Sequence, residues 1–234
     1  MTQTSVRENL LRIQERIASA AARAGRRAEE ITLIAVSKTH PASAIHEAYE
    51  AGVRHFGENR VQEWEGKRAE TEGLEATWHL TGHLQSNKAA RAAKLFHSVD
   101  SVDDFAIAQR LNRARAEVAI IDKLRVLIEV RVAPEETKSG VEISELPALA
   151  EKFAGLRQLE LAGLMCIPPF LEDAERVRPY FRRLRELRED LAKKLGLGLP
   201  VLSMGMSHDF EVAIEEGATE VRVGTAIFGV REYK

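Results

Sequence analysis

The sequence has few of the features that would suggest an oxidising compartment, a membrane or a nucleic-acid partner. Cys166 is the single cysteine among 234 residues, which excludes an intrachain disulfide and favours a reducing compartment. No stretch approaches the roughly 18 apolar residues of a membrane span, and the polar, amphipathic start MTQTSVRENLLRIQERI is unlike a secretory signal. The formal net charge is −2, and no long run of one sign is present. These absences predict a soluble, cytoplasmic globular protein that binds neither nucleic acid nor membrane.

The chain also lacks the features that divide a sequence into domains. No stretch rich in proline, glycine and serine resembles a linker, no segment is of low complexity, and no sequence repeat is visible. The length is sufficient to bury a sizeable core. We therefore expect a single domain over residues 1–234.

What is present is a regular alternation of two patterns. Residues 4–24 carry apolar side chains at helical spacing, and Gly25 then provides a stop signal. Eight apolar runs rich in β-forming residues follow, at 31–37, 53–57, 76–81, 95–99, 124–132, 159–165, 199–203 and 219–223. Between them lie segments of helical periodicity, such as 41–51, 103–117, 174–195 and 208–217. Strand–helix alternation predicts a parallel sheet covered by helices.

The number of strands indicates which parallel fold to expect. Eight βα units in 234 residues leave about 29 residues per unit, which is workable for a (β/α)₈ TIM-type barrel. A doubly wound open sheet is the alternative, but it normally has fewer strands and a glycine fingerprint after the first one. Here that turn reads SKTHP. We expect an α/β barrel with an extra N-terminal helix that covers the barrel bottom or mediates association.

Lys38 stands at the end of the first apolar run, in TLIAVSKTHP, where an ammonium group is costly to desolvate. One interpretation is a side chain that extends past the strand end to solvent. The other is a Schiff-base lysine, because an apolar, cationic setting lowers the pKa of the amine and makes it a nucleophile. Pro41 suits the first turn of the next helix. The N-terminus of that helix would add partial positive charge near Lys38.

Two small-residue turns follow the last two predicted strands. The turn SMGMS contains Gly205, and Gly224 with Thr225 follows the last strand. Backbone N–H groups in such turns bind phosphate, and barrels often hold a phosphate at the loops after strands 7 and 8. The alternative is two tight turns that need glycine for backbone geometry only. In a closed barrel these turns and Lys38 would be neighbours.

Arg222 lies inside the eighth predicted strand, where an arginine needs a ligand or a partner. A buried ion pair with Glu220 or another acid is the alternative to a ligand. His79 and His83 have the spacing of a zinc helix but straddle a strand end, so we expect no metal site. His79 would instead line a pocket or be a hydrogen-bonded core histidine.

Three further side chains lie near the strand ends, and their roles can be narrowed but not all decided from the sequence. Asn59 and Glu63 could orient Lys38 or could cap the helix after the second strand. Cys166 has no evident catalytic partner, so packing is the better interpretation.

Six segments at successive predicted strand ends carry a family resemblance. They read LIAVSKTHP, FGENRVQE, WHLTGHLQSNK, KSG, GLMCIPP and LSMGMSHDFEVAIEEGATEVRVGTAIFG. Together they resemble the pyridoxal phosphate homeostasis protein family, whose fold is similar to the barrel domain of alanine racemase. The resemblance covers about residues 31–233.

The resemblance implies a binding site for pyridoxal 5′-phosphate (PLP). Lys38 would form the internal aldimine, and Ser207 with the backbone N–H groups of Gly224 and Thr225 would hold the phosphate. Arg222 would face the pyridine nitrogen, as the arginine of the similar segment does in alanine racemase. Four more residues would line the site: Asn59, His79, Ser203 and Met204. One position departs from the family, because Arg131 stands where asparagine is usual, although Lys138 and Gly140 match.

The resemblance also bears on catalysis. An arginine beside the pyridine nitrogen disfavours its protonation and weakens the electron sink that PLP chemistry uses. Racemisation further needs a base on each face of the substrate. In similar racemases one base is a tyrosine from a second domain, and here Tyr233 on the short tail is a poor substitute.

We therefore predict a non-catalytic protein that carries PLP as a Schiff base and takes part in intracellular vitamin B6 homeostasis and the regulation of amino-acid metabolism. PLP-dependent apo-enzymes are candidate recipients, and the sequence leaves a monomer and a weak dimer open. One alternative is a PLP-dependent amino-acid racemase with weak activity. Another is a cofactor-free Schiff-base aldolase, which would leave Arg222 unexplained.

Overall fold

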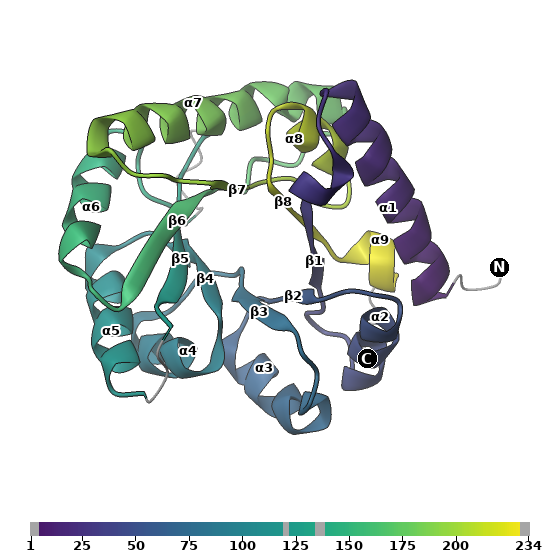
Figure 1. Cartoon of the computed structure of the whole chain (residues 1–234), viewed down its shortest axis with the longest axis horizontal. Helices are drawn as coiled ribbons and strands as arrows, with labels where there is room; N and C mark the ends of the chain where they lie inside the picture. Colours follow the sequence, from purple (N-terminus) through teal and green to yellow (C-terminus); the bar gives the residue numbers. More distant parts are fainter. Residues whose placement is uncertain (1–4, 119–121, 134–138, 230–234) are drawn as a thin grey trace.

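The computed structural model describes residues 5–118, 122–133 and 139–229, and within them eight parallel strands close into a barrel (Figure 1). The strands are β1 (Thr32–Val36), β2 (His55–Glu58), β3 (Thr77–Leu80), β4 (Ser98–Val102), β5 (Leu124–Glu129), β6 (Leu159–Met165), β7 (Val201–Ser203) and β8 (Glu220–Val223). Each strand pairs with the next, and β8 pairs with β1. The predicted (β/α)₈ barrel is confirmed, and the open doubly wound sheet is excluded.

Helices surround the barrel and connect its strands. The α-helices are α1 (Val6–Arg23), α2 (Ala42–Glu50), α3 (Val61–Arg68), α4 (Ala89–Leu95), α5 (Phe105–Ala116), α6 (Leu146–Lys152), α7 (Arg178–Leu195), α8 (Phe210–Glu215) and α9 (Thr225–Phe228). Short 3-10 helices are η1 (Ala28–Glu30), η2 (Ala69–Thr71), η3 (Ser86–Lys88), η4 (Phe153–Gly155) and η5 (Ala174–Val177). None of the described helices is both long and apolar enough to cross a membrane.

Each predicted strand overlaps an observed one, and the largest displacement of a start is at β4, which begins three residues later than the expected run 95–99. The apolar pair Leu95 and Phe96 belongs to the end of α4 instead. Phe96 is buried and its ring approaches that of Trp64 on α3. An apolar run that continues from a helix end into a strand has no period of its own, so its boundary could not be placed from the sequence.

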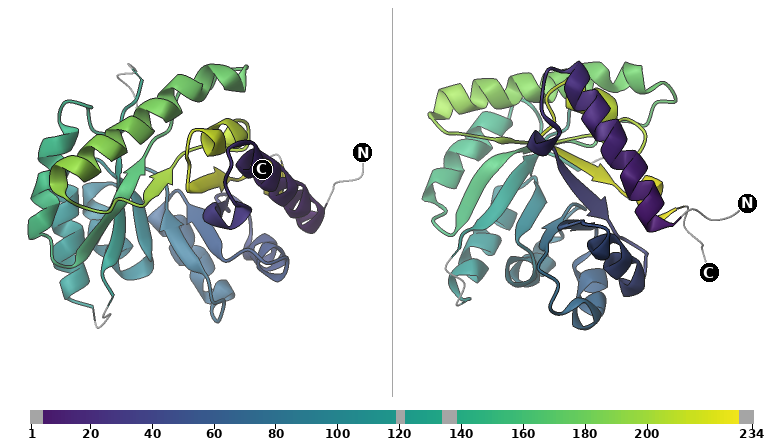
Figure 2. Two further views of the ribbon diagram at one scale, coloured as in Figure 1. Left: turned by 45° about the horizontal axis from the view of Figure 1, so that its top comes forward. Right: turned by 45° about the vertical axis from the view of Figure 1, so that its right-hand side comes forward.

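The N-terminal helix lies on the outer wall of the barrel. Ser5 and Glu8 form a capping box at the start of α1, and its apolar stripe is buried against α8, α9 and α2 (Figure 2). Asn9 donates from its side chain to Ile227 O of α9 at 2.9 Å. Of the two roles left open for this helix, covering the barrel bottom is not the one observed, because its apolar stripe matches the helices that flank β1 and β8. A role in association stays a prediction.

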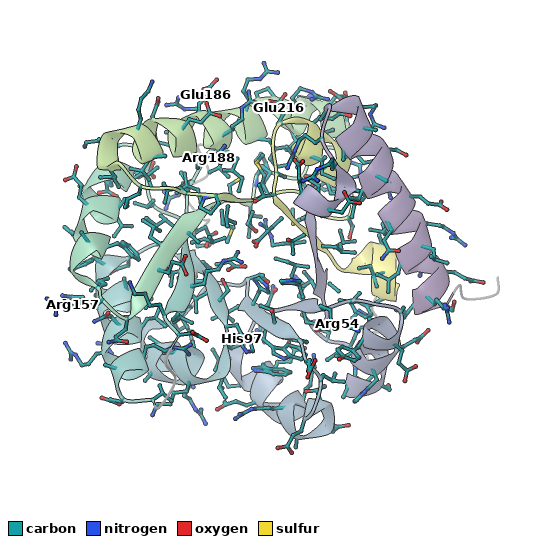
Figure 3. All side chains as sticks on the ribbon, in the orientation of Figure 1. Arg54, His97, Arg157, Glu186, Arg188 and Glu216 are labelled. Carbon is teal, nitrogen blue, oxygen red and sulfur yellow. The ribbon has the colours of Figure 1, made fainter. Side chains whose placement is uncertain are left out.

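Polar and apolar residues are separated by the barrel wall. Nearly all buried apolar side chains of the described residues form one cluster between the outer strand faces and the helices, and a smaller cluster lies around Leu127 and Met165. Charged side chains such as Arg157 and Glu186 point outward (Figure 3). Paired residues on parallel strands share a face, so Ile34 lies beside Arg222. Many of the buried polar groups, Arg222 among them, lie on the strand faces turned into the barrel.

Candidate functional site

A cavity of about 240 Å³ opens at the carboxyl ends of the strands. Six of the residues predicted for the site line it: Lys38, Asn59, Ser207, Arg222, Gly224 and Thr225. The loops after β1, β2, β7 and β8 supply five of them and β8 itself supplies Arg222, which brings the lysine, the arginine and both small-residue turns together. This is the end of the barrel where active sites are found in this architecture.

The other three predicted residues do not line the cavity. His79, Ser203 and Met204 are each fully buried. Ser203 touches the cavity only through Arg222, which donates to Ser203 Oγ at 2.7 Å. Met204 follows the end of β7 and packs in the outer apolar cluster. These three residues lie one layer deeper or on the opposite face of a strand, so their role in holding a cofactor stays a prediction.

Lys38 is carried on a turn with an unusual backbone. Val36 and Lys38 both line the cavity, while Ser37 between them points outward to Glu58. Thr39 has φ of 67°, a left-handed conformation that costs a β-branched residue about 1–2 kcal/mol. The amide of His40 closes the turn by donating to Ser37 O at 3.1 Å. This backbone persists only because neighbouring groups hold it.

Those neighbouring groups come from β2 and α3. The amide of Thr39 donates to the carboxylate of Glu63, and Lys67 Nζ donates to Glu63 Oε1 at 2.8 Å. Lys67 also donates to Glu58 Oε1 at 3.0 Å and to Ser37 O at 2.9 Å. Of the two roles left open for Glu63, contact with the lysine turn is the one observed. The start of α3 has no side-chain cap hydrogen bond, so the capping role proposed for Asn59 and Glu63 is not observed.

The two carboxylates in this network have opposite pKa shifts. Glu58 is fully buried, and burial raises its pKa even though Lys67 acts in the other direction. Burial would also raise the pKa of Glu63, but hydrogen bonds from Lys67 and from the Thr39 amide lower it below its ordinary value. Lys67 and Glu58 were missed in the sequence, where the only signal was the clustering of charges after a strand end.

The turns after β7 and β8 meet at Ser207. The backbone N–H groups of Gly224 and Ala226 both donate to Ser207 Oγ at 3.3 Å, so two donors converge on one point of the cavity wall. A Cβ at Gly224 would lie 3.1 Å from Val36 O, and one at Gly205 would lie 2.6 Å from the Cβ of Ala213. Gly205 also has φ of 92°. Both glycines are therefore required by close approach, and the convergent donors suit an anion.

Arg222 forms the floor of the cavity and is 4% exposed. Its guanidinium donates to Ser203 Oγ and to Cys166 O, both at 2.7 Å. The alternative of an ion pair with Glu220 was wrong, since Glu220 pairs with Arg125. No ion pair among the described residues involves Arg222. Burial raises the pKa of Cys166 to about 12, which keeps its thiol neutral and agrees with a packing role.

A second polar group lies beneath the cavity, inside the barrel. His79 Nδ1 lies 3.1 Å from Asp100 Oδ2, and Glu220 is close enough for the three side chains to surround a common point. The same groups are already engaged by neighbours: Ser98 donates to Asp100, and Arg125 donates to Glu220. His79 is thus the hydrogen-bonded core histidine of the two interpretations. We call His79, Ser98, Asp100, Arg125 and Glu220 the lower cluster.

Comparison with known proteins identifies relatives over nearly the full length. The model of the alanine racemase N-terminal domain matches residues 9–232. The pyridoxal phosphate homeostasis protein of Aquifex aeolicus is 47% identical over 226 residues, which are 97% of this chain and 98% of that protein. The protein of the same name from Pseudomonas aeruginosa is 48% identical over 230 residues, 98% of this chain and 97% of that protein.

Solved structures agree with these sequence relatives. The structure of PipY from Synechococcus elongatus with PLP bound has a TM-score of 0.82 and 43% identity, and covers 93% of this chain and 100% of that one. An alanine racemase from Clostridium difficile has a TM-score of 0.75 at 15% identity, covers 98% of this chain and 58% of the racemase, and shows the fold alone. The extent and level of identity place this chain in the pyridoxal phosphate homeostasis protein family, on the barrel fold of the alanine racemase N-terminal domain.

Proposed function

We propose that this protein binds PLP reversibly as a Schiff base on Lys38 and serves, without turnover, as a carrier or buffer in intracellular vitamin B6 homeostasis and so in the regulation of amino-acid metabolism. The observation that carries the proposal is a single cavity that joins Lys38, the convergent donors around Ser207 and the floor arginine Arg222. PLP-dependent apo-enzymes are the proposed recipients. The bound PLP of the relative PipY supports the choice of cofactor.

The residues present fit the group. PLP supplies an aldehyde that an amine can capture and a phosphate that needs hydrogen-bond donors. Lys38 provides the amine, and the N–H groups of Gly224 and Ala226 with Ser207 Oγ provide donors at one point of the cavity wall. Arg222 is positioned by Ser203 and Cys166 O to present its remaining N–H surface toward the ring.

The floor residue Arg222 bears on the chemistry that PLP would supply, although alanine racemase has a matching arginine, so Arg222 by itself does not separate a carrier from a racemase. A guanidinium has donors and no acceptor, so Arg222 offers nothing that could hold a proton on a facing pyridine nitrogen. A PLP ring bound over Arg222 would be a weaker electron sink than one paired with a carboxylate. Asp209 also lines the cavity, but its Oδ1 accepts from the Met206 amide at 2.6 Å, and burial raises its pKa. We infer a holding site in which Arg222 would position the ring.

A weak PLP-dependent amino-acid racemase is the second candidate, and two histidines favour it. His40 and His208 line the cavity, and an imidazole can transfer protons near neutral pH. His208 Nε2 lies 3.1 Å from Leu171 O and 3.0 Å from Glu172 O, so this nitrogen carries its proton and only Nδ1 can accept. Chiral analysis of a panel of amino acids separates the candidates: sustained turnover at ordinary enzyme rates would contradict the carrier.

The binding proposal is tested by trapping the lysine. Protein mixed with PLP is reduced with borohydride, and peptide mass spectrometry is expected to place a pyridoxyl group on Lys38. The visible absorption band of the Schiff base should be lost in Lys38→Ala and kept in Lys94→Ala, an exposed lysine outside the cavity. A pyridoxyl group found only on other lysines would overturn the proposal. A carbonyl compound trapped on Lys38 in the absence of PLP would support the aldolase instead.

A further inference from the structure

Lys67 has no contact with the cavity, yet it is tied to both peptide groups that flank Lys38. On one side it donates directly to Ser37 O at 2.9 Å. On the other it holds Glu63 Oε1 at 2.8 Å, and Glu63 accepts from the amide of Thr39. The backbone of Lys38 is thus clamped before and after its Cα by one side chain from α3.

The third hydrogen bond of Lys67 completes the set. It goes to Glu58 Oε1 at 3.0 Å, and the same oxygen accepts from Ser37 Oγ at 2.7 Å. An ammonium has three donors, and all three are used on groups that surround the turn. Lys67 is 13% exposed and Glu58 is fully buried, so the contacts lie largely out of water. Buried charge-assisted hydrogen bonds are stronger and more directional than exposed ones.

The hydrogen bonds of Lys67 and Glu63 hold the backbone at Thr39, which would otherwise relax. Thr39 has φ of 67°, where a β-branched residue is strained. The Glu63 carboxylate accepts the Thr39 amide in this conformation, and Lys67 keeps that carboxylate charged and in place. If the turn relaxed, the direction of the Lys38 side chain would change relative to the donors at Ser207.

We propose that Lys67 is a positioning residue that, through Glu63 and Ser37, holds the strained Thr39 turn and so aims the amine of Lys38 into the cavity. The inference rests on the proposed function for its consequence, PLP binding, but not for its geometry. It predicts that the contacts of Lys67 on the outer face of the barrel wall control the affinity for PLP in the cavity on the inner face. A merely structural role would anchor α3 on the barrel and leave the turn unchanged.

The test uses Lys67→Met and Glu63→Ala, with Arg68→Met as the matched control, an exposed cation on the same helix. Glu63 is only partly buried, so its alanine variant remains informative if Lys67→Met fails to fold. We expect the Kd for PLP to rise at least about tenfold in both, which equals ~1.4 kcal/mol of lost positioning. Arg68→Met should match the parent protein. Unchanged affinity in Glu63→Ala would overturn the proposal.

A rescue separates positioning from general stability. Glycine adopts positive φ without strain, so Thr39→Gly should remove the need for the clamp. We expect Glu63→Ala to weaken PLP binding much less when Thr39→Gly is also present, as a double-mutant cycle would measure. If Glu63→Ala costs the same affinity in both backgrounds, the turn is not what Glu63 holds.

A readout without PLP keeps this inference separate from the proposed function. In the cofactor-free protein, the Thr39 amide should exchange its hydrogen at least about tenfold faster in Lys67→Met and Glu63→Ala than in Arg68→Met. Unchanged exchange would overturn the positioning role even if PLP binds Lys38. Faster exchange in a protein that shows no Schiff base would keep the clamp and reject the proposed function.

Discussion

Inside the barrel, the lower cluster and the cavity above it are both built from buried polar groups. In the lower cluster the polar groups contact one another: His79 contacts Asp100, and Arg125 forms an ion pair with Glu220. In the cavity, Arg222 is held by uncharged oxygens and takes part in no ion pair among the described residues. One region satisfies its polar groups largely within itself, whereas the other leaves donors directed at a ligand-sized space. We expect the first to control stability and the second to control binding.

The largest expected effect comes from breaking the lower cluster. In Arg125→Met, the carboxylate of Glu220 stays buried without its partner, so the free energy of unfolding should fall by about 3 kcal/mol. Urea unfolding at neutral pH measures it. The double variant with Glu220→Gln should recover part of the loss, because the stranded charge is gone. A loss below about 1 kcal/mol would mean that the cluster does not depend on this ion pair.

A smaller stability effect and a clear binding effect are expected at the cavity. Ser207→Ala removes the hydroxyl on which two backbone donors converge, and should raise the Kd for PLP about tenfold, or ~1.4 kcal/mol. Its free energy of unfolding should change by less than about 1 kcal/mol. Ser19→Ala, on the outer face of α1, is the control. If Ser207→Ala instead lost stability and kept its affinity, the contrast between the two regions would fail.

The smallest effect is a pH dependence at the lysine turn. The folded state lowers the pKa of Glu63, through Lys67 and the Thr39 amide acting against burial. Its charge therefore contributes stability above the unfolded pKa of about 4.3, and this contribution is lost as the pH falls through the lower folded value. Glu63→Gln should be less stable than the parent near neutral pH, and the difference should shrink in acid.

Urea unfolding between about pH 7 and pH 3 measures this difference. Glu72→Gln, at an exposed carboxyl just past the end of η2, should show a much smaller difference from the parent over the range. A difference for Glu63→Gln that grows as the pH falls would show that the folded state does not favour the charged form of Glu63.

Much of the fold could be predicted because the pattern is local. Apolar runs and helical segments alternate along the chain, and all eight strands were placed, with β4 displaced by three residues. The displacement arose where Leu95 and Phe96 link a helix end to a strand. The position of α1 could not be predicted, since an apolar stripe indicates that a face is buried but not which surface buries it.

The site was predicted in part for the same reason. Chemistry at strand ends indicated Lys38 and the turns at Ser207 and Gly224, which the structure brings into one cavity. Depth could not be inferred: His79 lies on the inner face one layer below Thr81, and it is Thr81 that lines the cavity. Alternation along a strand separates inside from outside but does not distinguish layers of one interior.

By itself, the sequence determined the barrel, the order of its strands and the lysine at the end of the first, because period and residue type act over a few neighbouring positions. Only the tertiary structure decided which polar groups compensate one another and which face a cavity. Lys67 reaches Ser37 across 30 positions of chain, and Arg125 reaches Glu220 across 95. The first contact depends on the packing of α3 over neighbouring strands, and the second on closure of the sheet, and no local sequence pattern records either.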